Sequence, residues 1–111
     1  MQVGNCIDAG DGTVETVTLI ACAKPHDGEI FAIRDLRAAR WPGERAVHEQ
    51  SGRACELAFR PYIGIAYDSS YLVITTYEPT ADSWPQGDHR TFCVVSEPKG
   101  KTVGGLRGAK R

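Results

Sequence analysis

The chain has 111 residues, of which 41% are hydrophobic and 24% are charged, a composition typical of one globular domain. Its 13 basic and 14 acidic residues give a formal net charge of −1, so it lacks the basic surplus that binds nucleic-acid phosphates, and no nucleic-acid partner is expected. It also lacks the ~18-residue apolar run of a membrane-spanning helix and a signal-peptide pattern after Met1, which fits either a cytosolic protein or a mature domain separated from its signal or anchor.

Three strands are predicted in the first third of the chain. Val3–Ile7 and the β-branched segment Val14–Cys22 flank the turn-forming run Asp8–Gly12, and together they predict a hairpin. After a second turn at Lys24–Gly28, alternating side chains predict a third strand over Glu29–Leu36.

One amphipathic helix is predicted over Glu44–Phe59, where apolar residues recur at helical spacing and an acidic residue stands in the first turn. Pro61 disfavours helical geometry at the residue before it and has no N–H to donate. We therefore expect the helix to end near Phe59, with Tyr62 and Ile63 packing just beyond it.

The last part of the chain predicts further strands at Tyr71–Tyr77 and Arg90–Val95, with a short one at Val103–Leu106. The order β-β-β-α-β-β predicts an α+β fold, a mostly antiparallel sheet of about five or six strands with one main helix packed on it. Residues 1–108 are expected to form one domain, and residues 109–111 a C-terminal tail.

The four cysteines, Cys6, Cys22, Cys55 and Cys93, are dispersed and include no C-x-x-C pair, which favours two disulfides over a zinc or redox motif. Three pairings exist. The predicted elements favour Cys6 with Cys22, on neighbouring strands, and Cys55 with Cys93, joining the helix to a strand. The alternative is four reduced cysteines buried in a cytosolic domain. Two disulfides would place the chain in an oxidising, extracytoplasmic compartment.

Several landmarks occur together along the chain: Val3-Gly4-Asn5-Cys6, the segment Cys22–Ala32, Tyr62-Ile63-Gly64, Trp84 with Gly87-Asp88 before Cys93, and Gly104–Gly108. Together they resemble the septum formation family of bacterial envelope domains, and the block Cys-x-x-Pro-His-x-x-Glu is the most specific part. The resemblance implies an extracytoplasmic domain, usually tethered behind a transmembrane segment, linked by name to cell division and without an established enzymatic activity. One departure is His89, which stands where the family pattern has an arginine, with Arg90 one place later.

Six polar residues form a candidate binding or structural cluster: His26, Asp27, Glu29, Asp88, His89 and Arg90. A metal-dependent or carboxylate-based cell-wall hydrolase would use His26, Glu29, Asp88 and His89, since imidazole and carboxylate are zinc ligands. A hydrogen-bonded structural cluster is favoured instead, because spacing in a turn before a strand does not make side chains converge. The chain also has no G-x-S-x-G elbow or catalytic triad, so no enzyme, metal or cofactor is expected.

Aromatic residues provide the candidate recognition surface: Trp84, with Tyr77 and Tyr71. Their rings give large, stiff contact areas for sugars or peptides. The alternative is that Trp84 plugs the core beneath its loop, while Trp41 packs at the helix entrance. The expected function is a non-catalytic binding or assembly module of a cell-envelope protein, whose partner is an envelope protein or a cell-wall glycan; a plain spacer is a further alternative.

Overall fold

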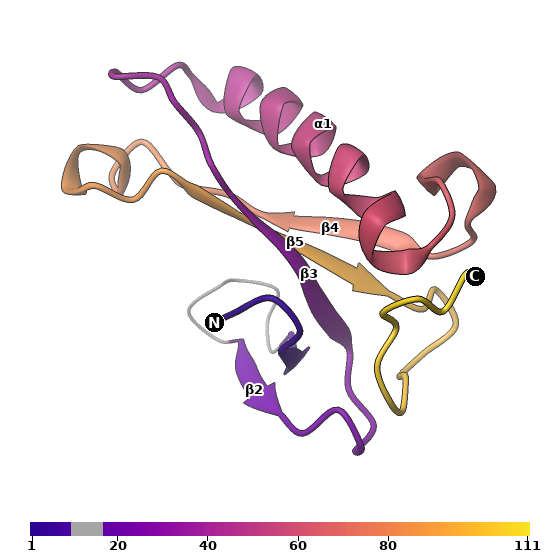
Figure 1. The fold of residues 1–111 in the computed structure, drawn as a ribbon. Coiled ribbons are helices and arrows are strands. Elements are labelled where there is room, and N and C mark those ends of the chain that lie inside the picture. Colours follow the sequence, from indigo (N-terminus) through magenta and orange to yellow (C-terminus); the bar gives the residue numbers. More distant parts are fainter. Residues whose placement is uncertain (10–16) are drawn as a thin grey trace.

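A computed structural model describes residues 1–9 and 17–111. In this part of the chain, five strands form one antiparallel sheet in the order β2-β1-β3-β5-β4, and the long helix α1 crosses one face of it (Figure 1). The elements are β1 (Cys6–Asp8), β2 (Thr18–Ile20), β3 (Gly28–Asp35), α1 (Glu44–Ile63), η2 (Tyr67–Ser69), β4 (Val73–Tyr77), η3 (Trp84–Gln86) and β5 (Arg90–Ser96). The predicted α+β class and element order are confirmed.

The N-terminal hairpin is present but shorter than predicted. Strand β1 pairs antiparallel with β2, with Cys6 opposite Ile20 and Asp8 opposite Thr18. Most of the predicted turn and the start of the predicted second strand fall on residues 10–16, which lie outside the described residues.

Strand β3 is the centre of the sheet. It pairs with β1 through Glu29 opposite Cys6, and with β5 from Glu29 opposite Val95 to Asp35 opposite Arg90, with a shift of register between Ile30 and Ala32. Its first five residues are all buried, because α1 covers one face of the strand while a smaller apolar cluster around Ile7 covers the other. Ile30, Phe31 and Ala32 are therefore buried in succession, on both faces of the strand.

The prediction that the helix ends near Phe59 is wrong, because α1 continues through Pro61 to Ile63. A proline in the last turn removes a single backbone hydrogen bond, and Pro61 lies on the exposed side, where water can solvate the carbonyl that loses its donor. Continuing the helix buries the side chains of Tyr62 and Ile63. Gly64, at a φ of 103°, then ends it in the left-handed conformation that favours glycine.

The predicted strand at Val103–Leu106 is also wrong. Residues 103–106 form no strand; Thr102, just before them, makes an isolated bridge to His26, and the chain then turns at Gly104, whose φ is 86°. A positive φ interrupts an extended strand. The apolar pattern instead reflects Leu106, which is buried in the main core.

The main core lies between α1 and the sheet, and its largest members are Phe31, Phe59, Tyr62, Ile63, Leu72, Val95 and Leu106. The Cys55–Cys93 disulfide crosses this core and joins α1 to β5, while Cys6–Cys22 joins β1 to the segment after β2. Both predicted pairings are confirmed. Among the residues described, no helix combines the length and apolar character needed to cross a bilayer.

The last three residues, expected to be a tail, lie against the end of α1. The backbone N–H of Lys110 donates to the carbonyl of Ile63 at 2.8 Å, and Arg111 pairs with Glu97 at 3.6 Å. These contacts hold the C-terminal end beside the helix.

Candidate functional site

A hollow of about 540 Å³ opens at one end of the sheet, where the loop between β3 and α1 meets the loop between β4 and β5. Figure 1 shows both loops at the same end, away from the marked C-terminus. The N–H of Leu36 donates to the carbonyl of His89 at 2.9 Å, which ties the two loops together. The principal lining residues are Arg40, Trp41, Trp84, Pro85 and His89, and we call this site the tryptophan hollow.

The second loop folds so that Trp84 points inward. Thr80 and Ser83 exchange hydrogen bonds, each backbone N–H donating to the other's hydroxyl, at 2.9 and 3.1 Å. Pro85 then stands in the first turn of η3, where its missing N–H costs nothing. Gly87, at a φ of 94°, ends the turn by donating its N–H to the carbonyl of Trp84.

The floor of the hollow is an aromatic stack. Trp84 is only 3% exposed and packs with Leu36 and Val47, as in the interpretation that it plugs the core. Trp41 meets it edge-to-face at 5.6 Å, and His89 stacks on it at 4.0 Å. The Nε2–H of His89 donates to the Trp84 carbonyl at 3.0 Å, which orients the imidazole. Trp41, half-buried, is the ring that a ligand could reach.

The polar groups of the hollow are mainly donors. The indole N–H of Trp84 is buried without an acceptor in the described part of the chain. Arg40 is exposed at the rim and forms no ion pair within residues 1–9 and 17–111. No carboxylate is among the residues that line the hollow. The site therefore offers an apolar floor, N–H donors and a positive charge.

The two tyrosines of the predicted recognition surface lie elsewhere. Tyr77 packs against the smaller cluster of Ile7, Ile30 and Val94, and burial, with the nearby Asp27, raises its pKa. Tyr71 is 53% exposed and precedes β4, at the opposite end of that strand, where its hydroxyl donates to Glu97. The structure thus does not bring these tyrosines to Trp84.

The six polar candidates are also divided between two ends of the sheet. Because β3 and β5 are antiparallel, Glu29 lies opposite Val95 while Asp35 lies opposite Arg90. Six strand residues separate the two ends by about 20 Å. His26, Asp27 and Glu29 are therefore at one end, and Asp88, His89 and Arg90 at the other. They do not share one cleft, so the four residues of the hypothetical hydrolase do not converge.

At the first end, His26 and Asp27 hold the turn before β3. The Nδ1–H of His26, which is fully buried, donates to the carbonyl of Lys24 at 2.8 Å. Asp27 accepts the backbone N–H of Ala9 at 2.9 Å, and this bond, reinforced by Lys101, lowers the pKa of Asp27. These contacts order a turn.

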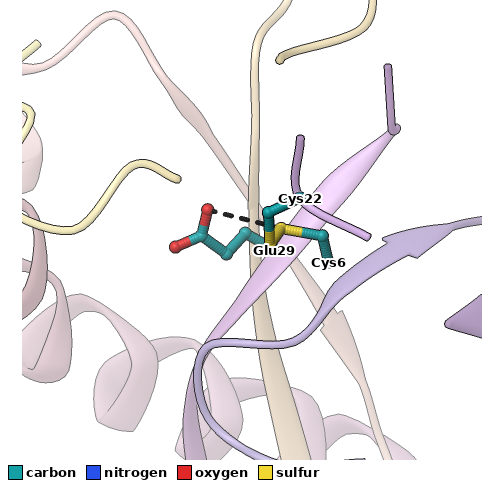
Figure 2. Close-up of side chains that lie close together, drawn as sticks. All are labelled: Cys6, Cys22 and Glu29. Carbon is teal, nitrogen blue, oxygen red and sulfur yellow. Dashed lines mark hydrogen bonds between the residues drawn. A yellow bond between two sulfur atoms is a disulfide. The ribbon is translucent and has the colours of Figure 1, made fainter. Parts of the chain in front are cut away.

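Glu29 is a carboxylate at the meeting point of four segments, and only 2% of it is exposed. Its Oε1 accepts the backbone N–H of Leu106 at 2.8 Å, and its Oε2 accepts the hydroxyl of Tyr62. Figure 2 shows the carboxylate beside the Cys6–Cys22 disulfide, whose Cys6 Sγ lies 3.8 Å from Oε1. A disulfide sulfur carries no hydrogen, so this approach is a packing contact. Glu29 thereby fastens the sheet, the helix and the C-terminal segment together.

The sulfur atoms of Cys6 and Cys22 and a carboxylate oxygen of Glu29 lie within 4.8 Å of one another, as a metal site would require. The cysteines ligate metals as thiolates, however, and here both sulfurs are used in the disulfide. The cluster of Cys6, Cys22 and Glu29 therefore stabilises the fold and is not a metal site.

Trp41 packs against Trp84, as predicted. Its place beside Arg40 in the lining of the hollow was not predicted, although a Trp-Pro pair occurs at both Trp41 and Trp84 and could have linked the two loops. The partners of Glu29 were not predicted either. Tyr62 and Leu106 stand 33 and 77 residues away, and no local pattern signals such contacts.

Comparison with known proteins gives the following matches. The family model described as "Septum formation" matches residues 2–108. An uncharacterized membrane protein of Mycobacterium tuberculosis is 29% identical over 106 residues, which are 86% of this chain and 24% of that protein. A protein of the same organism named as lipoprotein LppN is 27% identical over 114 residues, covering 95% of this chain and 61% of that protein. The chain thus spans about a quarter to three fifths of these relatives, and no solved structure matches it.

Proposed function

The chain belongs to the septum formation family, and on that premise we propose that it is a non-catalytic module of the bacterial cell envelope that binds cell-wall glycan in the tryptophan hollow. The observation that carries this proposal is the aromatic floor at the meeting point of two loops, with Trp41 half-buried at its edge.

An extracytoplasmic position is supported by two independent facts. The relatives are named a membrane protein and a lipoprotein. Both disulfides of the chain would be reduced in most bacterial cytosols, whereas they persist outside the membrane. The full-length protein is proposed to hold this domain at the membrane surface through a segment outside the present chain, and the family name suggests a place near the septum.

A glycan is the preferred ligand because of the shape and chemistry of the hollow. Its volume lies within the range of about 300–1,000 Å³ that small-molecule sites occupy. The apolar face of a sugar ring stacks on a flat indole such as Trp41, and sugar oxygens accept hydrogen bonds from N–H donors. A protein partner would bury about 800 Å² of this chain's surface, an area much wider than one hollow.

The absence of catalysis is supported by the placement of the polar residues. A carboxylate-based glycoside hydrolase needs an acid and a base on either side of one bond, typically within about 10 Å of each other. The candidate groups here are at opposite ends of β3, and Glu29 is enclosed by Tyr62 and Leu106 instead of facing solvent.

The proposal is tested by co-sedimentation of the purified domain with insoluble peptidoglycan. The wild-type domain is expected to sediment, and a Trp41→Ala variant to remain in solution. Tyr71→Ala is the matched control, because Tyr71 is an exposed aromatic residue outside the hollow, and it should sediment like the wild type. Equal sedimentation of all three proteins, or of none, would contradict the proposal.

A second measurement does not depend on a variant. The chain has two tryptophans, and both line the hollow, so intrinsic tryptophan fluorescence reports on this site alone. Soluble wall fragments should change the emission of the wild-type domain in a saturable manner. If instead only an envelope protein is captured and glycan leaves the emission unchanged, the ligand is a protein and the glycan proposal fails.

A further inference from the structure

We infer that the tryptophan hollow selects an acidic amino sugar, with the guanidinium of Arg40 facing the sugar carboxylate and the indole N–H of Trp84 donating to a ligand oxygen. This inference rests on the proposed function, since it names the class of glycan that the hollow takes.

The first observation is the charge around the hollow. The loop from Leu36 to Gly43 contains two arginines, Arg37 and Arg40, and no acidic residue, and Arg40 is the one that lines the hollow. The facing loop has three acidic residues, and none of them lines the hollow: Asp82 and Asp88 are exposed, and Glu78 pairs with His48. A carboxylate at the rim would meet an arginine that has no ion-pair partner in the described part of the chain.

The second observation is the unpaired indole N–H. Trp84 is almost fully buried, lines the hollow, and carries an N–H without an acceptor among the residues described. Buried polar groups are nearly always paired, and each unpaired donor calls for an explanation. The indole nitrogen has almost no exposed surface, so a ligand oxygen accepts from it only once the wall of the hollow moves aside on binding.

The third observation concerns what the hollow does not offer. Neutral sugars present many hydroxyl donors, and sites that bind them need side-chain acceptors such as carboxylates or amides. The lining residues include no Asp, Glu, Asn or Gln. A carboxylate gives the guanidinium of Arg40 a charged acceptor, whereas a neutral sugar offers it only uncharged oxygens.

The test uses two disaccharides that differ by one carboxylate-bearing group. N-acetylglucosaminyl-N-acetylmuramic acid carries a lactyl ether with a carboxylate, and N,N′-diacetylchitobiose lacks it. Titration of the domain, followed by tryptophan fluorescence, should show about tenfold tighter binding of the acidic disaccharide, which corresponds to one charge-assisted hydrogen bond. Arg40→Gln should abolish this preference, because it weakens binding of the acidic disaccharide by more than it weakens binding of N,N′-diacetylchitobiose.

The matched control is Arg37→Gln, which removes a charge from the same loop outside the hollow and should keep the preference. Equal affinity for both disaccharides, or an unchanged preference in Arg40→Gln, overturns this inference while the glycan-binding function stands. Loss of the preference in both arginine variants also overturns it, since general charge attraction would then explain the selectivity. If neither disaccharide binds, the inference fails, and sedimentation with peptidoglycan decides separately whether the proposed function fails with it.

Discussion

Replacing Tyr62 by phenylalanine removes one hydroxyl from the centre of the fold and should destabilise the domain. The hydroxyl of Tyr62 donates to Oε2 of Glu29, and both side chains are buried. In the variant, Oε1 of Glu29 still accepts the N–H of Leu106, but Oε2 of Glu29 has lost its donor. Because the carboxylate is buried, water does not replace that donor. A hydrogen bond to a carboxylate contributes roughly 1.5–3 kcal/mol, so the free energy of unfolding at neutral pH should fall by about 2 kcal/mol.

The same contact predicts a decline in stability at alkaline pH. Burial, together with the hydrogen bond to Glu29, raises the pKa of Tyr62 from 10.0 to about 12. The folded state therefore holds the phenolic proton more tightly than the unfolded chain does. This stabilisation is complete below the unfolded pKa and is lost as pH rises from 10.0 through about 12. At about 1.4 kcal/mol per pKa unit, the loss is at most about 3 kcal/mol.

Urea unfolding of the disulfide-intact protein, followed by tryptophan fluorescence, measures both effects. Wild type should lose stability across the alkaline range, and Tyr62→Phe should start lower and lose less. The matched control is Tyr71→Phe, whose exposed hydroxyl donates to Glu97, and its free energy of unfolding should change by less than about 0.5 kcal/mol. A Tyr62→Phe variant as stable as wild type at neutral pH, with the same alkaline decline, would refute the role assigned to the buried hydrogen bond.

Three further changes test the fold itself. Replacing both cysteines of Cys55–Cys93 by alanine should lower the free energy of unfolding by about 4 kcal/mol, because that disulfide closes a loop of 38 residues. The same change at Cys6–Cys22 should cost about 3 kcal/mol, because its loop spans 16 residues. Urea unfolding measures both losses, and the opposite ranking would contradict this reasoning. Gly28→Ala should lower the free energy of unfolding by about 1–3 kcal/mol, because the added Cβ would lie 2.6 Å from Val94 Cγ1. Gly52→Ala in α1 should raise it by about 0.5–1 kcal/mol, because the added Cβ meets nothing within 4 Å. Thermal melting must shift in opposite directions for the two variants. Pro61→Ala restores an N–H to the last turn of α1 and should stabilise it by about 1 kcal/mol, with slower amide exchange in that turn; faster exchange would count against the helix geometry.

Much of the fold could be predicted because its signals are local. Alternation marks β3, β-branched runs mark β4 and β5, and an acidic residue at Glu44 marks the start of α1. The errors arose where packing over long distances overrides a local rule. Pro61 stays in the helix because the next two side chains reach the core, and Leu106 is apolar because it fills that core from an irregular segment.

The residues of the tryptophan hollow could be predicted only in part, because their contacts also depend on packing over long distances. Trp84 could be selected from its aromatic character and its loop, but whether Trp41 or Tyr77 lies beside it depends on the pairing of β3 with β5, which the sequence does not specify. The separation of His26 from His89 depends on that pairing as well. Because Glu29 is close to His26 in the sequence, the two were grouped in one polar cluster. In the structure, Glu29 instead binds Tyr62 of α1 and Leu106 of the C-terminal segment.

For a chain exported as proposed above, the strand order has a consequence for folding. Strand β5 lies between β3 and β4 but is the last of the five to leave a translocation channel that delivers the N-terminus first. Until it emerges, β4 has no neighbour, and Cys55 waits as a free thiol for Cys93 while Cys6 and Cys22 are already outside. We therefore expect folding to await complete secretion and to profit from a disulfide isomerase that corrects premature oxidation.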